Sequence, residues 1–489
     1  MEELSAASSE SDRDIETVNA CRILSRLFSE TAEICMDMLF LGDASNATAI
    51  QQSHVKFSEE LIYQLLECAQ FPYTSSDPSI SRMPLNFFYN LGLVLSNSDG
   101  EQGSYHPDQA TSSRYRSELL TRYLPVYECL LQITVVQMRM PESVFVSDAA
   151  IPDDISEVRA CWKEVVVDCC SILGIDKCMN TICNLLQNEI SSSALSCSRV
   201  ESILYSVELV SEWLPRNEEK YVPPLIEFMG QLSESNQALH LQITLIELYG
   251  LLSFWFVEHP QVLGPVMMRL FNHLSCAKKS LTAARTLMNI LRHCRNLPGL
   301  PVTDLYSHIQ QLRMSPGSTA LSVEAELLVL EGIAVVISSD DSRKQITTAD
   351  SEAAFRSIVQ PIVDDLRLMA PLLSKNSSSL QISTLISNID RLTMFFRFYR
   401  TIESSCVVDL LVNIIPLFKQ LNHSLANDRV AEHLCRTYKH AIRNVGLKFL
   451  QYLPAFTTHL TEEFAAVPVG AFLYAGFNTT QTLSVLRTI

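Results

Sequence analysis

The stretch NDRVAEHLCRTYKHAIRNVGLKF, residues 427–449, decides the fold. Its apolar residues recur at steps of three and four, which is the period of an amphipathic α-helix. They form one broad face suited to docking on a neighbour: Val430, Leu434, Tyr438, Ala441, Ile442, Val445 and Phe449. Residues 404–420 show the same helical period, so the two segments predict a helix pair.

The opposite side of this helix carries five nitrogen-bearing side chains, which are Arg429, His433, Arg436, His440 and Arg443. At 100° per residue they fall within an arc of roughly 80°. The chain as a whole is acidic, with 37 Lys+Arg against 54 Asp+Glu and a net charge of −17. A basic stripe on that background predicts an anion-binding surface. The alternative is a solvated face neutralised by acidic residues of adjacent repeats.

Outward from this pair, helix-length segments recur through the chain. We pair 155–173 with 176–190, 196–213 with 221–232, 236–257 with 260–274, 278–295 with 302–313, and 318–338 with 349–374. Residues 378–401 form a further helix without a clear partner, and a last pair starts near residue 454. One pair about every 40 residues is the period of HEAT and armadillo arrays. The sequence therefore predicts an all-α, right-handed α-solenoid of HEAT-like helix pairs rather than unrelated helical domains.

The helical pattern sets the domain boundaries. It begins near Asp14, so residues 1–13, rich in Glu, Ser and Ala, are predicted to be disordered, and residues 14–489 form the solenoid. Three polar segments, 97–114, 140–155 and 338–350, are predicted to be flexible loops.

Composition and motifs limit the function. The acidic balance argues against direct nucleic-acid binding, which depends on a basic face. No apolar run reaches the ~18 residues that span a bilayer, and the nearest candidate, 407–418, contains Asp409 and Pro416. The 14 cysteines form no CxxC pair or zinc-type spacing, as in a reducing compartment. We therefore expect no membrane segment, metal or cofactor.

No catalytic motif is present. GxxxxGK[ST], GxGxxG, HExxH and GxSxG are all absent from the sequence. The neighbours His293 and Cys294 lie between two arginines, where a lowered thiol pKa is conceivable. A helix end whose cations complement the dipole explains them better, because Pro298 and Gly299 follow directly. We expect the chain to act by binding and not as an enzyme.

Several blocks, in order, resemble the transportin-SR branch of the importin-β superfamily, karyopherins that import Ser/Arg-rich proteins. The blocks are 14–23, 28–31, 84–92, 246–250, 259–266, 406–446 and 472–476. Block 406–446 matches without a gap, including Asp428-Arg429, Cys435-Arg436 and Val445-Gly446. The resemblance implies a nuclear transport receptor of the importin type that shuttles between cytoplasm and nucleus, with nucleoporins among its partners.

The resemblance also implies a cargo site. In that family an arginine-rich helix binds phosphorylated Ser/Arg-rich cargo, and its arginines fall on Arg429, Arg436 and Arg443. Two further arginines of the family fall on His433 and Lys439, and His440 replaces an apolar residue. We expect the three arginines to carry binding of basic or phosphorylated Ser/Arg-rich signals. The histidines would be a pH-dependent supplement.

The resemblance covers the middle of a longer solenoid. The family's principal Ran-GTP surface lies in repeats that precede the matched blocks, so Ran-GTP switching by this polypeptide alone is not implied. We interpret the chain as a central piece of a longer solenoid or a shortened protein. An exportin-type karyopherin and a HEAT scaffold without transport activity remain as alternatives.

Overall fold

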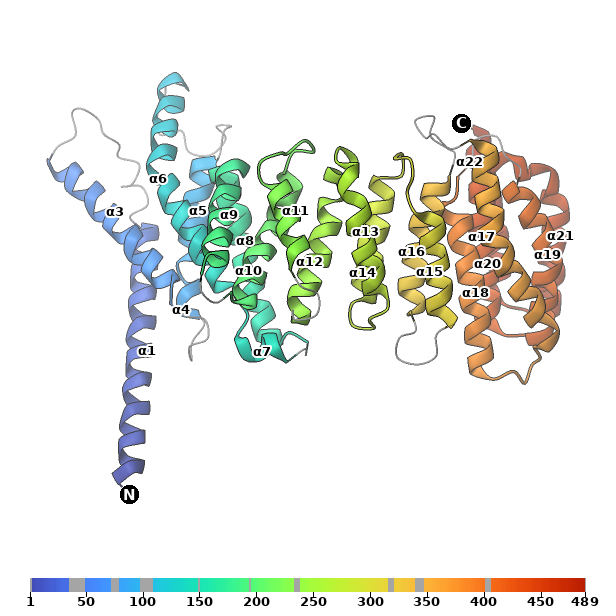
Figure 1. The fold of residues 1–489 in the computed structure, drawn as a ribbon, viewed down its shortest axis with the longest axis horizontal. Helices are drawn as coiled ribbons and strands as arrows, with labels where there is room; N and C mark the ends of the chain where they lie inside the picture. Colours follow the sequence, from blue (N-terminus) through green and yellow to red (C-terminus); the bar gives the residue numbers. More distant parts are fainter. Residues whose placement is uncertain are drawn as a thin grey trace. The chain divides into compact units, whose positions relative to one another are not determined.

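The regular secondary structure of the described residues is entirely helical. A computed structural model describes residues 2–34, 49–71, 79–96, 109–147, 150–192, 195–232, 238–314, 321–338, 347–400 and 406–488, and within these ranges no strand occurs (Figure 1). The chain divides into two compact units, residues 1–248 and 249–489. Each unit is described by itself below.

The first unit contains α1 to α11 and most of α12. The bounds are α1 Glu2–Ile34, α3 Ala49–Ala69, α4 Ser79–Arg82, α5 Leu85–Ser96, α6 Gln109–Gln137, α7 Glu142–Val146, α8 Asp153–Leu173, α9 Ile175–Ile190, α10 Cys197–Val210, η1 Ser211–Trp213, α11 Val222–Gln231 and α12 Leu239–Leu251. The second unit contains the remaining helices: η2 Leu252–Val257, α13 Pro260–Leu274, α14 Ser280–His293, α15 Val302–Met314, α16 Val323–Ile337, α17 Thr348–Met369, η3 Ala370–Leu372, α18 Ser379–Phe398, α19 Cys406–Leu425, α20 Asp428–Val445, η4 Gly446–Tyr452, α21 Leu453–Ala466 and α22 Gly470–Thr488.

Neighbouring helices form pairs, and the pairs stack into two rows. In the second unit α13 packs on α14, α15 on α16, α17 on α18, α19 on α20 and α21 on α22. The second helices of these pairs, α14 to α22, contact one another along the array more extensively than the first helices do. The second-row side is therefore the more closely packed side of this unit. In the first unit, α6 with α8 and α9 with α10 continue the pattern.

The predicted helices are found, but their pairing is shifted by one helix. The sequence pairs 278–295 with 302–313 and 318–338 with 349–374, whereas α14 packs on α13, and α17 packs more extensively on α18 than on α16. Segment 378–401, which had no partner, is therefore the second helix of a pair. It starts with a capping box in which the Ser378 and Gln381 side chains bond each other's backbone N–H. The pair 404–420 with 427–450 is paired as predicted.

The predicted boundaries of the non-helical segments need correction. Helix α1 begins at Glu2, so residues 2–13 are helical here rather than disordered. Residues 109–114 belong to α6, and residues 97–108 lie outside the described residues. The segment 140–155 contains α7, which is anchored by the buried Phe145, and the start of α8. In the segment 338–350, Thr347 caps α17 through its side chain, and 339–346 lie outside the described residues.

Buried ion pairs tie neighbouring second-row helices together. In the first unit both Nη atoms of Arg159 on α8 donate to the Glu201 carboxylate on α10. In the second unit Arg391 on α18 donates twice to Glu326 on α16. All four side chains are at least nine-tenths buried. Because an unpaired buried charge is costly, each pair fixes which helix faces which neighbour.

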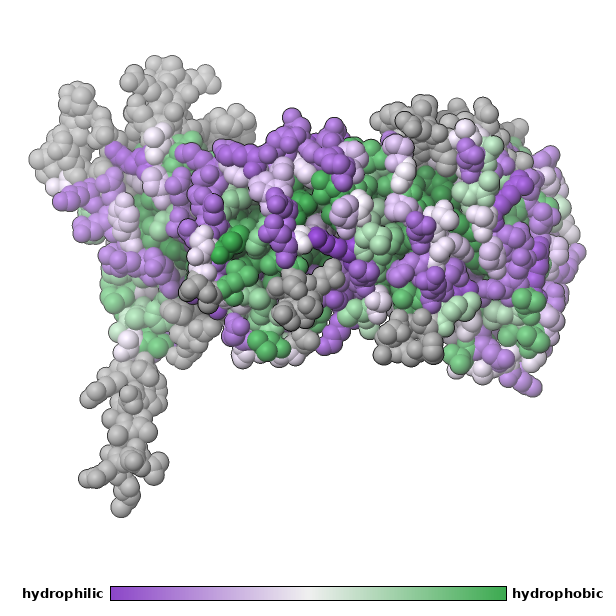
Figure 2. All heavy atoms as spheres, viewed as in Figure 1, coloured by the Kyte–Doolittle hydropathy of each residue, from purple (hydrophilic) through white to green (hydrophobic). Residues whose placement is uncertain are grey.

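One apolar helical stretch is long enough to cross a membrane by length and composition. It is Leu239–Val257, and 67% of its most apolar window is buried in the structure. Packing accounts for its apolar character, because core helices of folded proteins have the same composition. The candidate from the sequence, 407–418, lies inside α19. On the face drawn in Figure 2, apolar side chains show in separate areas with hydrophilic residues between them.

A glycine marks the most extensive helix contact among the described helices, that of α14 with α16. A Cβ on Gly332 would lie 2.7 Å from Leu291 Cδ1 and 3.3 Å from Met288 Cα. We expect Gly332→Ala to destabilise the chain by about 1–2 kcal/mol, because α14 must move outward. Gly476→Ala in α22 is the matched control, since the nearest atom to its Cβ is Leu460 Cδ1 at 3.8 Å, and it should stabilise by up to about 1 kcal/mol. Urea unfolding of both variants tests this, and equal effects would contradict it.

Candidate anion-binding site

Helix α20 is positioned by its ends and by its buried face. The Asn427 side chain accepts a hydrogen bond from Val430 N at 3.2 Å, which caps the first turn. Gly446 ends the helix with a φ of 58°, a conformation that favours glycine. The Thr437 hydroxyl lies 2.7 Å from that of Thr393 on α18, and both groups are buried. The predicted apolar face is buried as expected from Val430 to Ile442.

The three arginines of the stripe lie on the exposed side of α20. Arg429, Arg436 and Arg443 are all exposed. Among the described residues, no carboxylate lies within ion-pair distance of any of the three. The alternative of a face neutralised by adjacent repeats therefore does not apply to these arginines. Unpaired cations on a second-row helix are available to an anionic ligand.

The other predicted site residues are engaged by neighbouring helices. His433 Nδ1 lies 2.6 Å from Asp390 Oδ1 on α18, so an acid occupies the stripe between Arg429 and Arg436. Lys439 Nζ donates to the Tyr474 hydroxyl on α22 at 3.5 Å and lies 5.2 Å from the ring centroid. Lys439 thus keeps its charge near the stripe while Tyr474 orients it.

His440 is half-buried and surrounded by cations. The pKa of His440 is lowered to about 4, first by burial and then by the positive charges around it. The four charges are Arg397 of α18 and Arg436, Lys439 and Arg443 of α20. His440 is therefore neutral at pH 7. Protonation of His440 near neutrality is disfavoured, because a cation at this position would be half-buried among like charges.

We call the four cations Arg397, Arg436, Lys439 and Arg443 the basic cluster. The sequence prediction missed Arg397, because it assigned no partner helix to segment 378–401. It therefore did not predict that a cation of this segment lies close to those of α20. The Arg397 guanidinium carbon lies 4.8 Å from the Phe398 ring centroid. Arg429, two turns before Arg436, is not among the cations that act on His440. The cations around His440 thus lie on the C-terminal half of α20 and on α18.

The low pKa of His440 makes stability depend on pH. Its ordinary pKa is 6.5, so between about pH 6.5 and 4 the unfolded chain binds a proton that the folded chain does not. Stability contributed by the neutral ring is therefore lost as the pH falls through this window. We expect His440→Gln to reduce the slope of unfolding free energy against pH in this window. His273 and His459, whose pKa values are also about 4, account for the slope that remains. An unchanged slope in urea titrations would contradict this.

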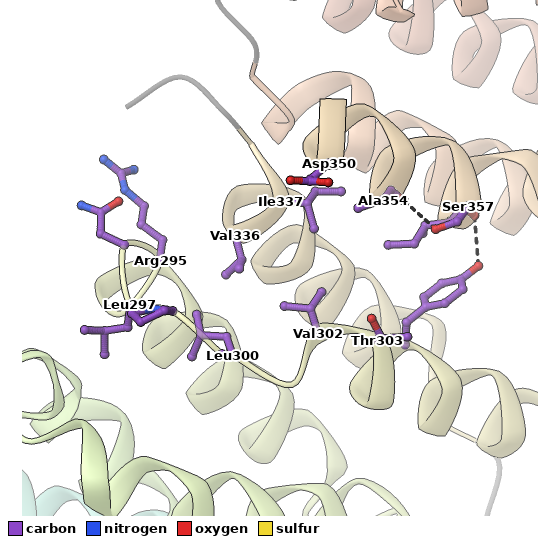
Figure 3. Close-up of a pocket in the computed structure, with 15 residues that line it drawn as sticks. Arg295, Leu297, Leu300, Val302, Thr303, Val336, Ile337, Asp350, Ala354 and Ser357 are labelled. Atoms are coloured by element: carbon purple, nitrogen blue, oxygen red, sulfur yellow. Dashed lines mark hydrogen bonds between the residues drawn. The ribbon is translucent and has the colours of Figure 1, made fainter. Parts of the chain in front are cut away.

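The remaining candidates for chemistry are structural. The pKa of the Cys294 thiol is raised to about 12 by burial, the opposite of an activated nucleophile. A cavity of about 510 Å³ lies between the connection that follows α14 and helices α16 and α17 (Figure 3). Its lining includes Arg295, Asp350 and Tyr306 but neither histidine nor cysteine. No cluster of metal-binding side chains occurs among the described residues.

Comparisons with known proteins agree with this architecture. No protein-family model matches the sequence. An uncharacterised protein of Schizosaccharomyces pombe is 22% identical over 377 residues, which is 72% of this chain and 38% of the relative. Human importin-13 is 22% identical over 267 residues, which is 54% of this chain and 26% of importin-13. The chain thus matches well under half the length of these relatives.

Solved structures show the fold. The cytosolic state of importin-13 superposes with a TM-score of 0.76 at 17% identity, covering 96% of this chain and 52% of that one. A complex of Kap95 with Nup1 superposes with a TM-score of 0.57 at 14% identity, covering 91% and 51%. The predicted all-α solenoid is confirmed. The chain therefore has the HEAT-repeat fold of the importin-β superfamily of karyopherins.

Proposed function

We propose that this chain is the cargo-binding part of an importin-type nuclear transport receptor, and that the basic cluster binds phosphorylated Ser/Arg-rich cargo. The observation that carries the proposal is a group of four cations that have no carboxylate within ion-pair distance among the described residues. They lie on second-row helices of a chain whose net charge is −17. The fold supports the transport role, and the transportin-SR-like blocks support the choice of cargo.

The spacing of the cluster suits a phosphorylated extended segment. Lys439 and Arg443 lie one turn apart, about 6 Å along the helix axis, and Arg436 lies about 10 Å from Arg443. Phosphoserines at alternate positions of an extended chain recur every ~6.6 Å. Each phosphate carries close to two charges and accepts paired hydrogen bonds from a guanidinium. The acidic remainder of the chain attracts the arginines of such a cargo and repels polyanionic nucleic acid.

The transport role implies partners beyond the cargo. We propose that the full receptor binds Ran-GTP and nucleoporins and that it moves between cytoplasm and nucleus. Two solved structures of similar fold are Kap95 in complex with Nup1 and Kap95 bound to RanGDP. An exportin and a scaffold without transport activity are the competing functions for the same fold.

A pull-down separates these functions. An immobilised phosphorylated Ser/Arg-rich protein is incubated with the receptor that contains this chain, with and without Ran-GTP. Release of the receptor by Ran-GTP supports an importin. Retention only in the presence of Ran-GTP would indicate an exportin, and indifference to Ran-GTP would indicate a scaffold.

A further inference from the structure

A carboxylate interrupts the row of cations on α20. Asp390 of α18 lies beside His433, with 2.6 Å between Asp390 Oδ1 and His433 Nδ1. The Asp390 side chain is 20% exposed, and among the described residues no arginine or lysine lies within ion-pair distance of it. A carboxylate offers about four acceptor positions, and His433 occupies one of them. Asp390 can therefore accept hydrogen bonds from a bound molecule.

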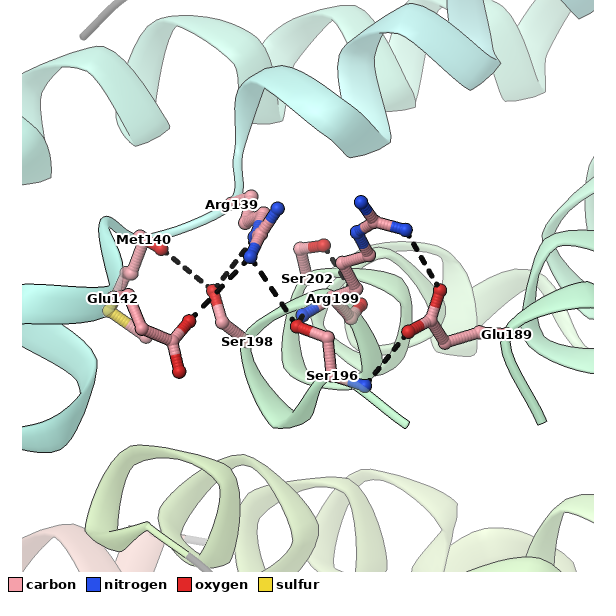
Figure 4. Close-up of polar contacts among 8 residues, drawn as sticks. All are labelled: Arg139, Met140, Glu142, Glu189, Ser196, Ser198, Arg199 and Ser202. Atoms are coloured by element: carbon pink, nitrogen blue, oxygen red, sulfur yellow. Dashed lines mark hydrogen bonds and ion pairs between the residues drawn. The ribbon is translucent and has the colours of Figure 1, made fainter. Parts of the chain in front are cut away.

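Two arginines near the start of α10 in the first unit show the contrasting arrangement. Arg139 lies 3.6 Å from the Glu142 carboxylate, and Arg199 lies 3.5 Å from that of Glu189 (Figure 4). Each of these arginines is neutralised by a carboxylate of the same fold. The arginines of the stripe have no carboxylate within ion-pair distance among the described residues. Charges of both signs around α20 are therefore available to a ligand.

The position of Asp390 along α20 is fixed by contacts further along the two helices. The hydroxyl groups of Thr393 on α18 and Thr437 on α20 lie 2.7 Å apart. Asn444 Nδ2 of α20 donates to the carbonyl oxygen of Phe396 on α18 at 2.9 Å. These contacts hold the helices in one register, so the carboxylate keeps its place beside the stripe.

The charges along the first half of α20 therefore alternate in sign. Arg429 and Arg436 are seven residues apart, which is about 10 Å along the helix axis. Asp390 lies between them, at the level of His433. Glu432, which is exposed and directly precedes His433, adds a second negative charge at the same turn. The order along the helix is positive, negative, positive.

A segment with the opposite order of charges complements this pattern. Phosphoserine, arginine and phosphoserine in succession have that order, and their two phosphoserines lie ~6.6 Å apart in an extended chain. The long, flexible side chains of Arg429 and Arg436 span the remaining few ångströms. A uniform polyanion, such as nucleic acid or a run of phosphoserines, would instead place a phosphate beside Asp390, where like charges repel.

We infer that Asp390 is a specificity-determining residue that binds an arginine of the cargo between two phosphoserines. His433 positions its carboxylate. This surface then selects a segment of alternating charge over one of uniform negative charge. The inference rests on the proposed function, because it names a further contact of the same cargo.

The test is a double-mutant cycle between Asp390 and the arginines of a synthetic peptide. One peptide alternates phosphoserine with arginine, and the other has the same phosphoserines with glutamine in place of every arginine. Both are titrated calorimetrically against the unaltered chain and Asp390→Asn at fixed ionic strength. Asparagine has the shape of aspartate, and its Oδ1 can still accept a hydrogen bond from His433. The variant should therefore stay folded, which circular dichroism checks.

Asp390→Asn should weaken the arginine peptide by roughly three- to fivefold and should not weaken the glutamine peptide. Glu432→Gln should act in the same direction by a smaller factor, because this side chain is more exposed. Asp304→Asn on first-row helix α15 is the matched control, since it also removes one exposed negative charge. It should change neither affinity by more than about twofold.

Equal weakening of both peptides by Asp390→Asn, or unchanged or tighter binding of the arginine peptide, would overturn the inference. The proposed function survives such a result if phosphorylation of the arginine peptide still tightens its binding to the unaltered chain. If phosphorylation has no effect on binding, the proposed function fails, and the inference fails with it.

Discussion

Glu326→Ala is expected to destabilise the chain by about 3–5 kcal/mol, because it leaves the Arg391 guanidinium buried without its counter-charge. Arg391 Nε and Nη2 donate to the two Glu326 oxygens at 2.7 and 2.6 Å, and the side chains are only 8% and 2% exposed. Asn388 Oδ1 accepts the remaining bond from Nη1. Because both side chains are buried, water does not easily replace the carboxylate as a partner of the guanidinium. Urea unfolding monitored by circular dichroism measures the loss.

Two controls make this prediction specific. Replacing both partners, Glu326→Leu with Arg391→Met, should restore most of the stability because no buried charge remains. Arg367 Nη1 lies 3.0 Å from Asp364 Oδ1, and both side chains are about half exposed. Removing this pair should destabilise the chain by at most about 0.5 kcal/mol. A double variant as unstable as Glu326→Ala would show that packing, rather than the unpaired charge, causes the loss.

Arg397/Arg436/Arg443→Ala is expected to weaken binding of a phosphorylated Ser/Arg peptide by roughly 100- to 1,000-fold. At these exposed positions each guanidinium contact with a phosphate is expected to contribute about 1–1.4 kcal/mol, and three guanidiniums are removed. Arg429→Ala should have a smaller effect, because it removes one guanidinium rather than three and Arg429 is not among the cations around His440. Isothermal titration calorimetry at fixed ionic strength measures the affinities.

The control variant removes the same charge elsewhere. Arg356/Arg367/Lys375→Ala deletes three exposed cations of α17 and the segment before α18. If long-range attraction alone held the peptide, both triple variants would weaken it equally. The proposed site requires the control to bind within about threefold of the unaltered chain.

The sequence predicted the helices well because their apolar periods are strong and their ends carry recognisable caps. It misjudged which helices pair, since short connections occur on both sides of each helix and periodicity does not say which neighbour is closer. Arg397 was missed for this reason. The neutral state of His440 could not be read from spacing, because it depends on burial and on a cation from another helix.

The exposed position of Arg429, Arg436 and Arg443 followed from the amphipathic pattern, and the structure confirms it. The ion pair of His433 did not follow, because Asp390 lies 43 residues away in sequence. The cargo role of the stripe stays a prediction, and we now propose it for the basic cluster on α18 and α20, next to Tyr474 of α22.

The most direct test compares one Ser/Arg-repeat peptide in phosphorylated and unphosphorylated form. Both are titrated calorimetrically into the unaltered chain at physiological ionic strength. The basic cluster predicts that phosphorylation tightens binding by at least about tenfold, since each phosphate gains guanidinium partners. Equal affinities, or tighter binding of the unphosphorylated peptide to the acidic chain, would contradict the proposed function.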